Sequence, residues 1–196
     1  MSVPQNTWLP GTTVYAPFLP PIDDPIYDPL SMRATGGTDL GDGANGREVQ
    51  FWGCSYDGAN INVVPEVSGS SFALPVADVL SCCLAFDTNM AVAICYTKAD
   101  GGYLYFFNSL TSSFQTMFIA GVTSCRVAVD KTTEFFNAQS DVIFAYVDDV
   151  GMIRWRQQRD RYAIEYTVGA ASAGKVMTRL GPTTDNRLQI QQLEVP

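Results

Sequence analysis

The chain has 196 residues, a length that suits one domain with an extension but not two independent globular units. Hydrophobic residues make up 46% of it, so the chain folds, and its net charge of -8 argues against a nucleic-acid binder held by phosphate contacts. Histidine is absent, which excludes Ser-His and Cys-His catalysis and histidine metal sites.

Residues 1–47 form a proline-rich and glycine-rich segment that we expect to be an extended arm and linker. Seven of the eleven prolines lie here, and that density rules out a helix. The glycine-rich stretch 36–46 predicts a flexible joint, so we place the boundary with the folded domain near Arg47.

The arm carries apolar side chains that an extended strip cannot bury by itself. We expect it to dock on a neighbouring subunit, with a belt around its own domain as the alternative. The expected contact residues are Trp8, Tyr15, Phe18, Ile22 and Tyr27.

Residues 48–196 contain three copies of one unit, at 48–88, 89–138 and 139–196. The segment 81–87 matches 124–130, an offset of 43 residues. Aromatic residues are expected to open a strand late in each copy; they are Phe72, Phe114 and Tyr162.

Each copy has short apolar runs separated by Asp-Gly-type turns, which predicts an all-β fold of meanders. In 142–147 both alternating sets of side chains are apolar, so we expect that strand to be covered on both faces. Three repeats of about 43 to 50 residues fit propeller blades, which we favour, or a β-trefoil. Three blades are too few to close a ring, so the exposed sheet edges require a partner.

The densest polar cluster, 154–162, holds four of the nine arginines. It suits a site for a carboxylate or phosphate, a subunit contact, or a solvated hairpin. We expect a subunit contact, formed by Arg154, Arg156, Arg159 and Arg161.

We expect no enzyme activity, no cofactor and no metal. The acidic pairs Asp23–Asp24 and Asp148–Asp149 are candidates for carboxylate catalysis, but turn formation explains the second pair, as it does Asp57 and Asp100. Five cysteines without a CxxC pair indicate reduced core thiols, and no apolar run approaches the roughly 18 residues of a membrane span. These features predict a soluble product of a reducing cytoplasm without membrane partners.

The third copy, from Asp141-Val142-Ile143-Phe144-Ala145-Tyr146 to Gln158-Arg159-Asp160-Arg161-Tyr162, resembles the repeat units of tailed-bacteriophage virion proteins. Those proteins carry propeller-like β-repeats in tail and connector components. The resemblance implies a structural subunit of a virion, in the tail, the connector or the head surface, made in the host bacterial cytoplasm. Its partners would be copies of itself and other virion proteins.

The alternative function is a carbohydrate-binding module for host-surface recognition. Exposed aromatic rings would then serve as stacking platforms for a surface glycan, with Trp52, Tyr103 and Trp155 as candidates.

Overall fold

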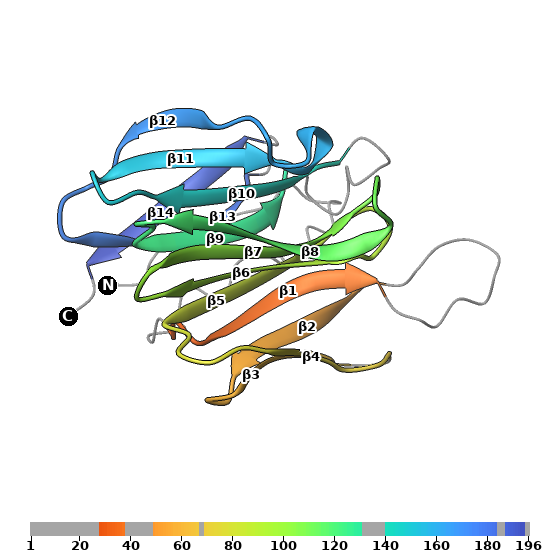
Figure 1. Cartoon of the computed structure of the whole chain (residues 1–196). Coiled ribbons are helices and arrows are strands. Elements are labelled where there is room, and N and C mark those ends of the chain that lie inside the picture. The colour runs from red at the N-terminus through yellow and green to blue at the C-terminus, as the bar shows by residue number, and fades with distance from the viewer. Residues whose placement is uncertain (1–27, 38–48, 67–68, 131–139, 184–186, 195–196) are drawn as a thin grey trace, which may run out of the picture.

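The computed structural model describes residues 28–37, 49–66, 69–130, 140–183 and 187–194, and it is all-β (Figure 1). The described strands form three four-stranded sheets and one two-stranded sheet. Neighbouring strands pair antiparallel and follow one another along the chain, so each sheet is a meander. The predicted all-β class is therefore confirmed.

The sheets are numbered in chain order. Sheet 1 contains β1 (Ser31–Gly37), β2 (Val49–Tyr56), β3 (Asn60–Pro65) and β4 (Phe72–Pro75). Sheet 2 contains β5 (Ser81–Phe86), β6 (Val92–Lys98), β7 (Gly101–Asn108) and β8 (Ser113–Ala120). Sheet 3 contains β9 (Ser124–Val129), β10 (Val142–Val147), β11 (Met152–Gln157) and β12 (Tyr166–Ala170), with the 3-10 turn η2 (Gln158–Asp160) after β11. Sheet 4 contains β13 (Lys175–Pro182) and β14 (Leu188–Glu194).

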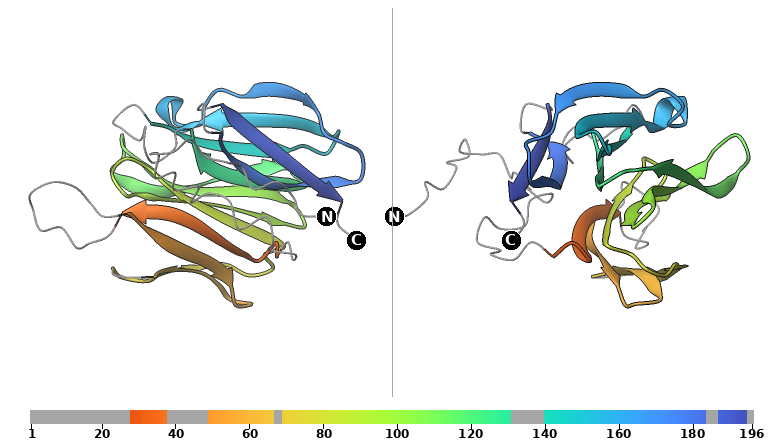
Figure 2. Two further views of the ribbon diagram at one scale, coloured as in Figure 1. Left: turned by 180° about the vertical axis from the view of Figure 1, so that it is seen from behind. Right: turned by 60° about the vertical axis from the view of Figure 1, so that its left-hand side comes forward.

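The four sheets are arranged as a fan (Figure 2, right). The first strand of each sheet lies beside the first strand of the next: β1 beside β5, β5 beside β9, and β9 beside β13. Hydrogen bonds support these contacts: the amide of Cys82 on β5 donates to Pro29 O in the turn before β1 (2.8 Å), and the amide of Met177 on β13 donates to Ser124 Oγ on β9 (3.2 Å). Sheets 1 and 4 are therefore the two flanks of the fan.

Apolar layers fill the spaces between successive sheets, and β10 shows how one strand serves two of them. Its side chains Val142, Phe144 and Tyr146 belong to the layer between sheets 2 and 3. The alternate side chains Ile143, Ala145 and Val147 face sheet 4, where they pack with Met177 and Leu180. The expectation that this strand is covered on both faces is confirmed.

The sequence repeats and the sheets are offset by one strand. The expected copies at 48–88 and 89–138 each begin with the second strand of one sheet and include the first strand of the next. Sheet 1 is completed by β1, which comes from the range assigned to the arm and pairs with β2. The last copy contains three strands of sheet 3 and, in addition, the whole of sheet 4.

The segment after β11 departs from the expected pattern. Tyr162 does not open a strand: it follows η2 with a left-handed backbone (φ 60°), and β12 starts at Tyr166. The Tyr162 ring is instead buried between sheets 2 and 3, where it packs edge-on against Phe106. The need to fill this core decides the local conformation, which strand patterning alone does not reveal.

Candidate functional site

The predicted contact residues of the arm, Trp8, Tyr15, Phe18, Ile22 and Tyr27, lie outside the described residues. The four predicted arginines can be placed, and the side chains of Arg154, Arg156 and Arg159 pair with carboxylates of the same chain.

Arg154 and Arg156 project from β11 on the face of sheet 3 that carries Tyr146. Arg154 pairs with Asp148 (Nε to Oδ2, 3.0 Å), which lies in the turn before β11. Arg156 donates to Glu165 Oε2 at 2.9 Å and to the carbonyl oxygen of Tyr162 at 2.9 Å. These guanidinium groups therefore tie the hairpin β10–β11 to the segment that leads into β12.

Tyr146 completes this network because its hydroxyl donates to the same Glu165 oxygen. Burial and this hydrogen bond raise the pKa of Tyr146 to about 12. The bond from Tyr146, followed by those from Arg156, lowers the pKa of Glu165. The carboxylate is thus held charged and coordinated, which suits a structural ion pair rather than a general acid.

Arg159 fixes η2 to the start of β10 in sheet 3. Its Nε donates to Asp141 Oδ2 at 2.6 Å, and its backbone amide donates to Asp141 Oδ1 at 3.0 Å. The neighbouring Gln158 donates at 2.9 Å to Oδ2 of Asp87, which directly follows β5 of sheet 2. The exposed Arg161 closes the turn with a left-handed backbone (φ 59°). The arginine segment therefore joins sheets 2 and 3, and its contact with another subunit remains a prediction.

The aromatic residues suggested as sugar platforms do not form one open surface. Trp52 is 7% exposed and packs on Phe86, so its prediction as an exposed platform was wrong: β2 points it into the layer between sheets 1 and 2. Trp155 stacks on Tyr166 with centroids 4.3 Å apart. The Tyr103 ring lies between those of Tyr96 and Phe118, and its centroid is 4.9 Å from each of theirs.

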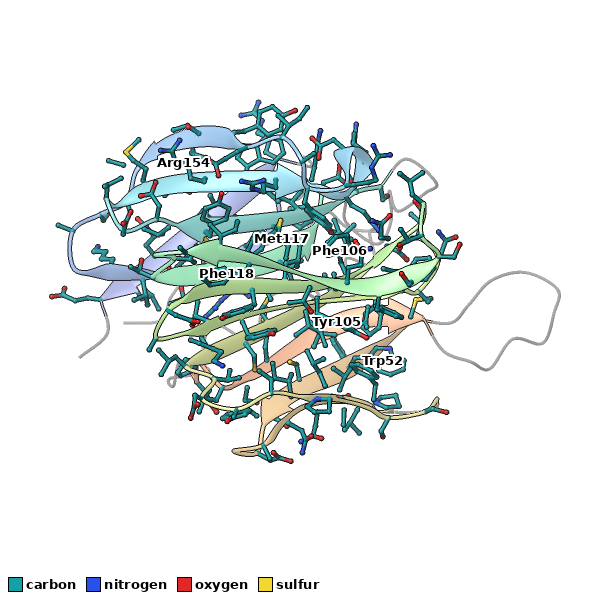
Figure 3. All side chains as sticks on the ribbon, viewed as in Figure 1. Trp52, Tyr105, Phe106, Met117, Phe118 and Arg154 are labelled. Atoms are coloured by element: carbon teal, nitrogen blue, oxygen red, sulfur yellow. The ribbon has the colours of Figure 1, made fainter. Side chains whose placement is uncertain are left out.

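Two exposed rings that were not among the expected sugar platforms lie on β8. Phe114 is 43% exposed and Phe118 is 50% exposed, and both are on the face of sheet 2 that turns toward sheet 1 (Figure 3 labels Phe118). The Phe114 ring stacks on Tyr105 of β7, and the Phe118 ring lies tilted by 39° against Tyr103 of the same strand. Their spacing in the sequence indicates a shared face, because residues separated by an even number of positions on one strand point to the same side of the sheet.

The outer strand of sheet 4 is the other unusual surface. β13 packs on sheet 3 through Met177 and Leu180, whereas β14 pairs with β13 on one side and, among the described strands, has no neighbour on the other. Leu193 on β14 is 53% exposed, while Ile190 of the same strand packs against the core. Sheets 1 to 3 carry two further strands at this position, so sheet 4 ends where the others continue.

Within the described ranges, no group of three or more histidine, cysteine, aspartate or glutamate side chains could hold a metal ion. No helix in the same ranges is long and apolar enough to cross a membrane. Comparisons with known protein families, curated proteins and solved structures gave no match.

Proposed function

We propose that this chain is a non-enzymatic structural subunit of a phage virion that assembles through its N-terminal arm and its sheet edges. The observation that carries the proposal is the two-stranded sheet 4: its strand β14 has a neighbour on one side only among the described strands, and it carries the exposed Leu193. An exposed strand edge is a template for pairing with another segment, so an isolated molecule with this edge is prone to association.

We further propose that the four sheets are the blades of an incomplete propeller. Two features support radial blades over a trefoil. The first strands of successive sheets lie side by side, and the strands of each sheet follow one another in meander order. The fan leaves the outer flanks of sheets 1 and 4 without a neighbouring sheet in the described part of the chain (Figure 2). Strands from another subunit would complete sheet 4 and bury its flank.

The arm has a composition that suits this edge. Residues 1–27 contain two aspartates and no lysine or arginine, whereas residues 175–194 carry three basic residues (Lys175, Arg179, Arg187) and two acidic ones (Asp185, Glu194), a small net positive charge. Residues 11–16 are free of proline and contain Thr, Val and Tyr, which favour strands. We therefore assign 11–16 as the segment that pairs with β14 of a neighbouring subunit.

The assignment to a phage particle is supported by the resemblance of the third repeat to virion repeats. The arginine network agrees with a structural role, because Arg154, Arg156 and Arg159 are held by carboxylates of the same chain. Guanidinium groups that are already paired are less available to an anionic substrate.

Glycan binding is the second candidate, and the exposed rings of Phe114 and Phe118 favour it. The open face of each ring offers a small apolar platform for a sugar. A double Phe114→Ala, Phe118→Ala variant that loses retention on a polysaccharide column would support this function. Equal retention of the variant and the parent would contradict it.

The test of the assembly proposal is the molar mass in solution, measured by light scattering on a sizing column. The truncated chain begins at Asp28, because a start at Arg47 would remove β1 and leave sheet 1 incomplete. We expect the full chain to form oligomers and the truncated chain to be monomeric.

Leu193→Lys on the β14 edge gives an independent variant, and Leu110→Lys is its matched control. Leu110 is 70% exposed and lies in the turn between β7 and β8, away from sheet 4. We expect Leu193→Lys to weaken association and Leu110→Lys to leave it unchanged. The same number of subunits in the parent, the truncated chain and both variants would contradict assembly through the arm and this edge.

A further inference from the structure

All five cysteines are buried, and two of them face each other across the boundary between sheets 1 and 2. Cys54 lies on β2 and Cys82 on β5, with their sulfur atoms 3.7 Å apart. The other three, Cys83, Cys95 and Cys125, belong to the layer between sheets 2 and 3. The Cys54–Cys82 pair therefore connects two sheets that otherwise touch through side-chain packing and inner-strand contacts.

We propose that Cys54 and Cys82 are a redox-sensitive pair that forms a disulfide under oxidising conditions and locks sheet 1 onto sheet 2. A disulfide requires the sulfur atoms to approach to about 2.05 Å. The thiols are already in van der Waals contact, so side-chain rotation and a small shift between the sheets supply the remaining approach. The reaction needs no rearrangement of strand order.

In the reduced state, both thiols of the pair donate hydrogen bonds. The Cys54 thiol donates to Cys82 Sγ, and the Cys82 thiol in turn donates to the carbonyl oxygen of Leu30 at 3.5 Å. The bond to Cys82 and burial raise the pKa of Cys54 well above its ordinary value. Because the thiolate is the attacking species, we expect oxidation in the folded protein to be slow.

The reaction with a small disulfide such as oxidised glutathione is balanced as follows. One cysteine thiolate attacks the glutathione disulfide, breaks its S–S bond and releases one glutathione thiolate, which takes up a proton. The second cysteine thiolate then attacks the mixed disulfide, forms the Cys54–Cys82 bond and releases the second glutathione. Two protein thiols are oxidised and one glutathione disulfide is reduced to two thiols.

The position of the pair explains what the bond would do. Sheet 1 is a flank of the fan, and its strands pack on sheet 2 on one face. A bond between β2 and β5 prevents sheet 1 from separating when the rest of the interface opens, and it closes a loop of 28 residues in the unfolded chain. This inference does not depend on the proposed function, since it concerns the chemistry of two thiols in one chain.

The experiment uses the full chain, purified in a thiol reductant and then held in buffers of defined ratios of reduced to oxidised glutathione. Samples are quenched in acid, denatured and alkylated, and the intact mass and the cysteine pairing are determined by mass spectrometry. Trypsin cannot resolve the pairing because no Lys or Arg occurs between residues 48 and 97. Cleavage after Asp and Glu separates Cys54 from the Cys82–Cys83 peptide, and fragmentation between Cys82 and Cys83 identifies the linked sulfur.

We expect the intact mass to fall by two hydrogen masses, with Cys54 linked to Cys82 and the other three cysteines alkylated. The oxidised chain should melt about 10 °C above the same sample after reduction. Cys54→Ala should abolish both effects, whereas Cys125→Ala, the matched buried control, should retain both. If a variant fails to fold, the cysteine pairing and the change in Tm of the parent chain are sufficient to test the proposal.

Two results would overturn the proposal. One is five alkylated cysteines after prolonged incubation in oxidised glutathione. The other is a bond that involves Cys83, Cys95 or Cys125 in place of the predicted pair. A Cys54–Cys82 bond without a rise in Tm would overturn the locking role, because the loop closure would then contribute no stability.

Discussion

The carboxylate of Asp141 holds Arg159 at two points: Oδ1 accepts from the backbone amide (3.0 Å) and Oδ2 accepts from Nε (2.6 Å). Asp141 is 3% exposed and directly precedes β10, while the Arg159 side chain is 58% exposed. The buried partner therefore fixes the position of a surface turn, η2, relative to sheet 3.

Replacing Asp141 by Asn should destabilise the protein by about 2 kcal/mol, because a buried charge-assisted pair is lost and the turn amide keeps only a neutral acceptor. Urea unfolding followed by circular dichroism measures this change. Asp149→Asn is the control, since Asp149 is exposed in a turn. Equal midpoints for Asp141→Asn and the parent would show that Asp141 does not hold η2.

Gly101 begins β7 at a position that admits no side chain. A Cβ there would lie 2.3 Å from the carbonyl oxygen of Ile119 on β8, and its φ of 153° disfavours L residues. Gly101→Ala should therefore cost at least about 2 kcal/mol of unfolding free energy.

Gly58→Ala is the control for Gly101→Ala, because it introduces backbone strain without steric overlap. Gly58 also has a positive φ, 98°, but a Cβ there meets nothing within 4 Å. We expect a loss of about 1 kcal/mol for Gly58→Ala. If both variants lose the same stability, the close approach of Ile119 is not the cause.

Two buried tyrosines should differ in how much stability the protein loses when the hydroxyl is removed. The hydroxyl of Tyr162 is buried with no hydrogen-bond partner among the described residues, whereas that of Tyr146 donates to Glu165. Tyr162→Phe should change stability by less than about 0.5 kcal/mol, and Tyr146→Phe should cost about 1 to 2 kcal/mol. Chemical denaturation of both variants tests the contrast, and an equally large loss for Tyr162→Phe would contradict it.

The turn between β2 and β3 should give the protein an acid-dependent stability. The side chain of Asn62, followed by the amides of Ala59 and Asn60, lowers the pKa of Asp57 from 3.8 to about 2. A carboxyl with a lowered folded-state pKa stabilises the fold above its unfolded value, and this contribution is lost as the pH falls from about 4 to about 2.

Asp57→Asn removes this titration, so its stability should fall less steeply than that of the parent over the same pH range. Thermal melts at a series of pH values measure the slopes. Identical slopes for the two proteins would show that Asp57 does not titrate differently in the folded and unfolded chains.

The sequence was sufficient for the strands and turns that depend on local chemistry. Asp57 and Asp148 accept hydrogen bonds from the amides of their own turns, as Asp in a β-turn does. The alternation in 142–147 indicated two covered faces because both sets of side chains were apolar. Patterns of this kind are set by neighbouring residues, so they can be read without knowing the tertiary structure.

Features that depend on long-range pairing were missed. β1 is rich in Gly and has little strand propensity, and its strand conformation comes from pairing with β2. Trp52 resembled a surface aromatic, but the register of β2 turns it inward. The carboxylate partners of Arg154, Arg156 and Arg159, which are Asp148, Glu165 and Asp141, were not expected either, while the contact of this segment with another subunit stays a prediction.

Because repeats and sheets are offset by one strand, each of the first two repeats contributes its last strand to the sheet that the next repeat completes. Each of sheets 2 and 3 takes its first strand from one repeat and its other three from the following repeat. Deleting the first or the second repeat would therefore damage two sheets at once, and no single repeat contains a complete four-stranded sheet. The chain should fold and unfold cooperatively across its sheets, and any lengthening by duplication must insert a whole repeat in phase with this overlap.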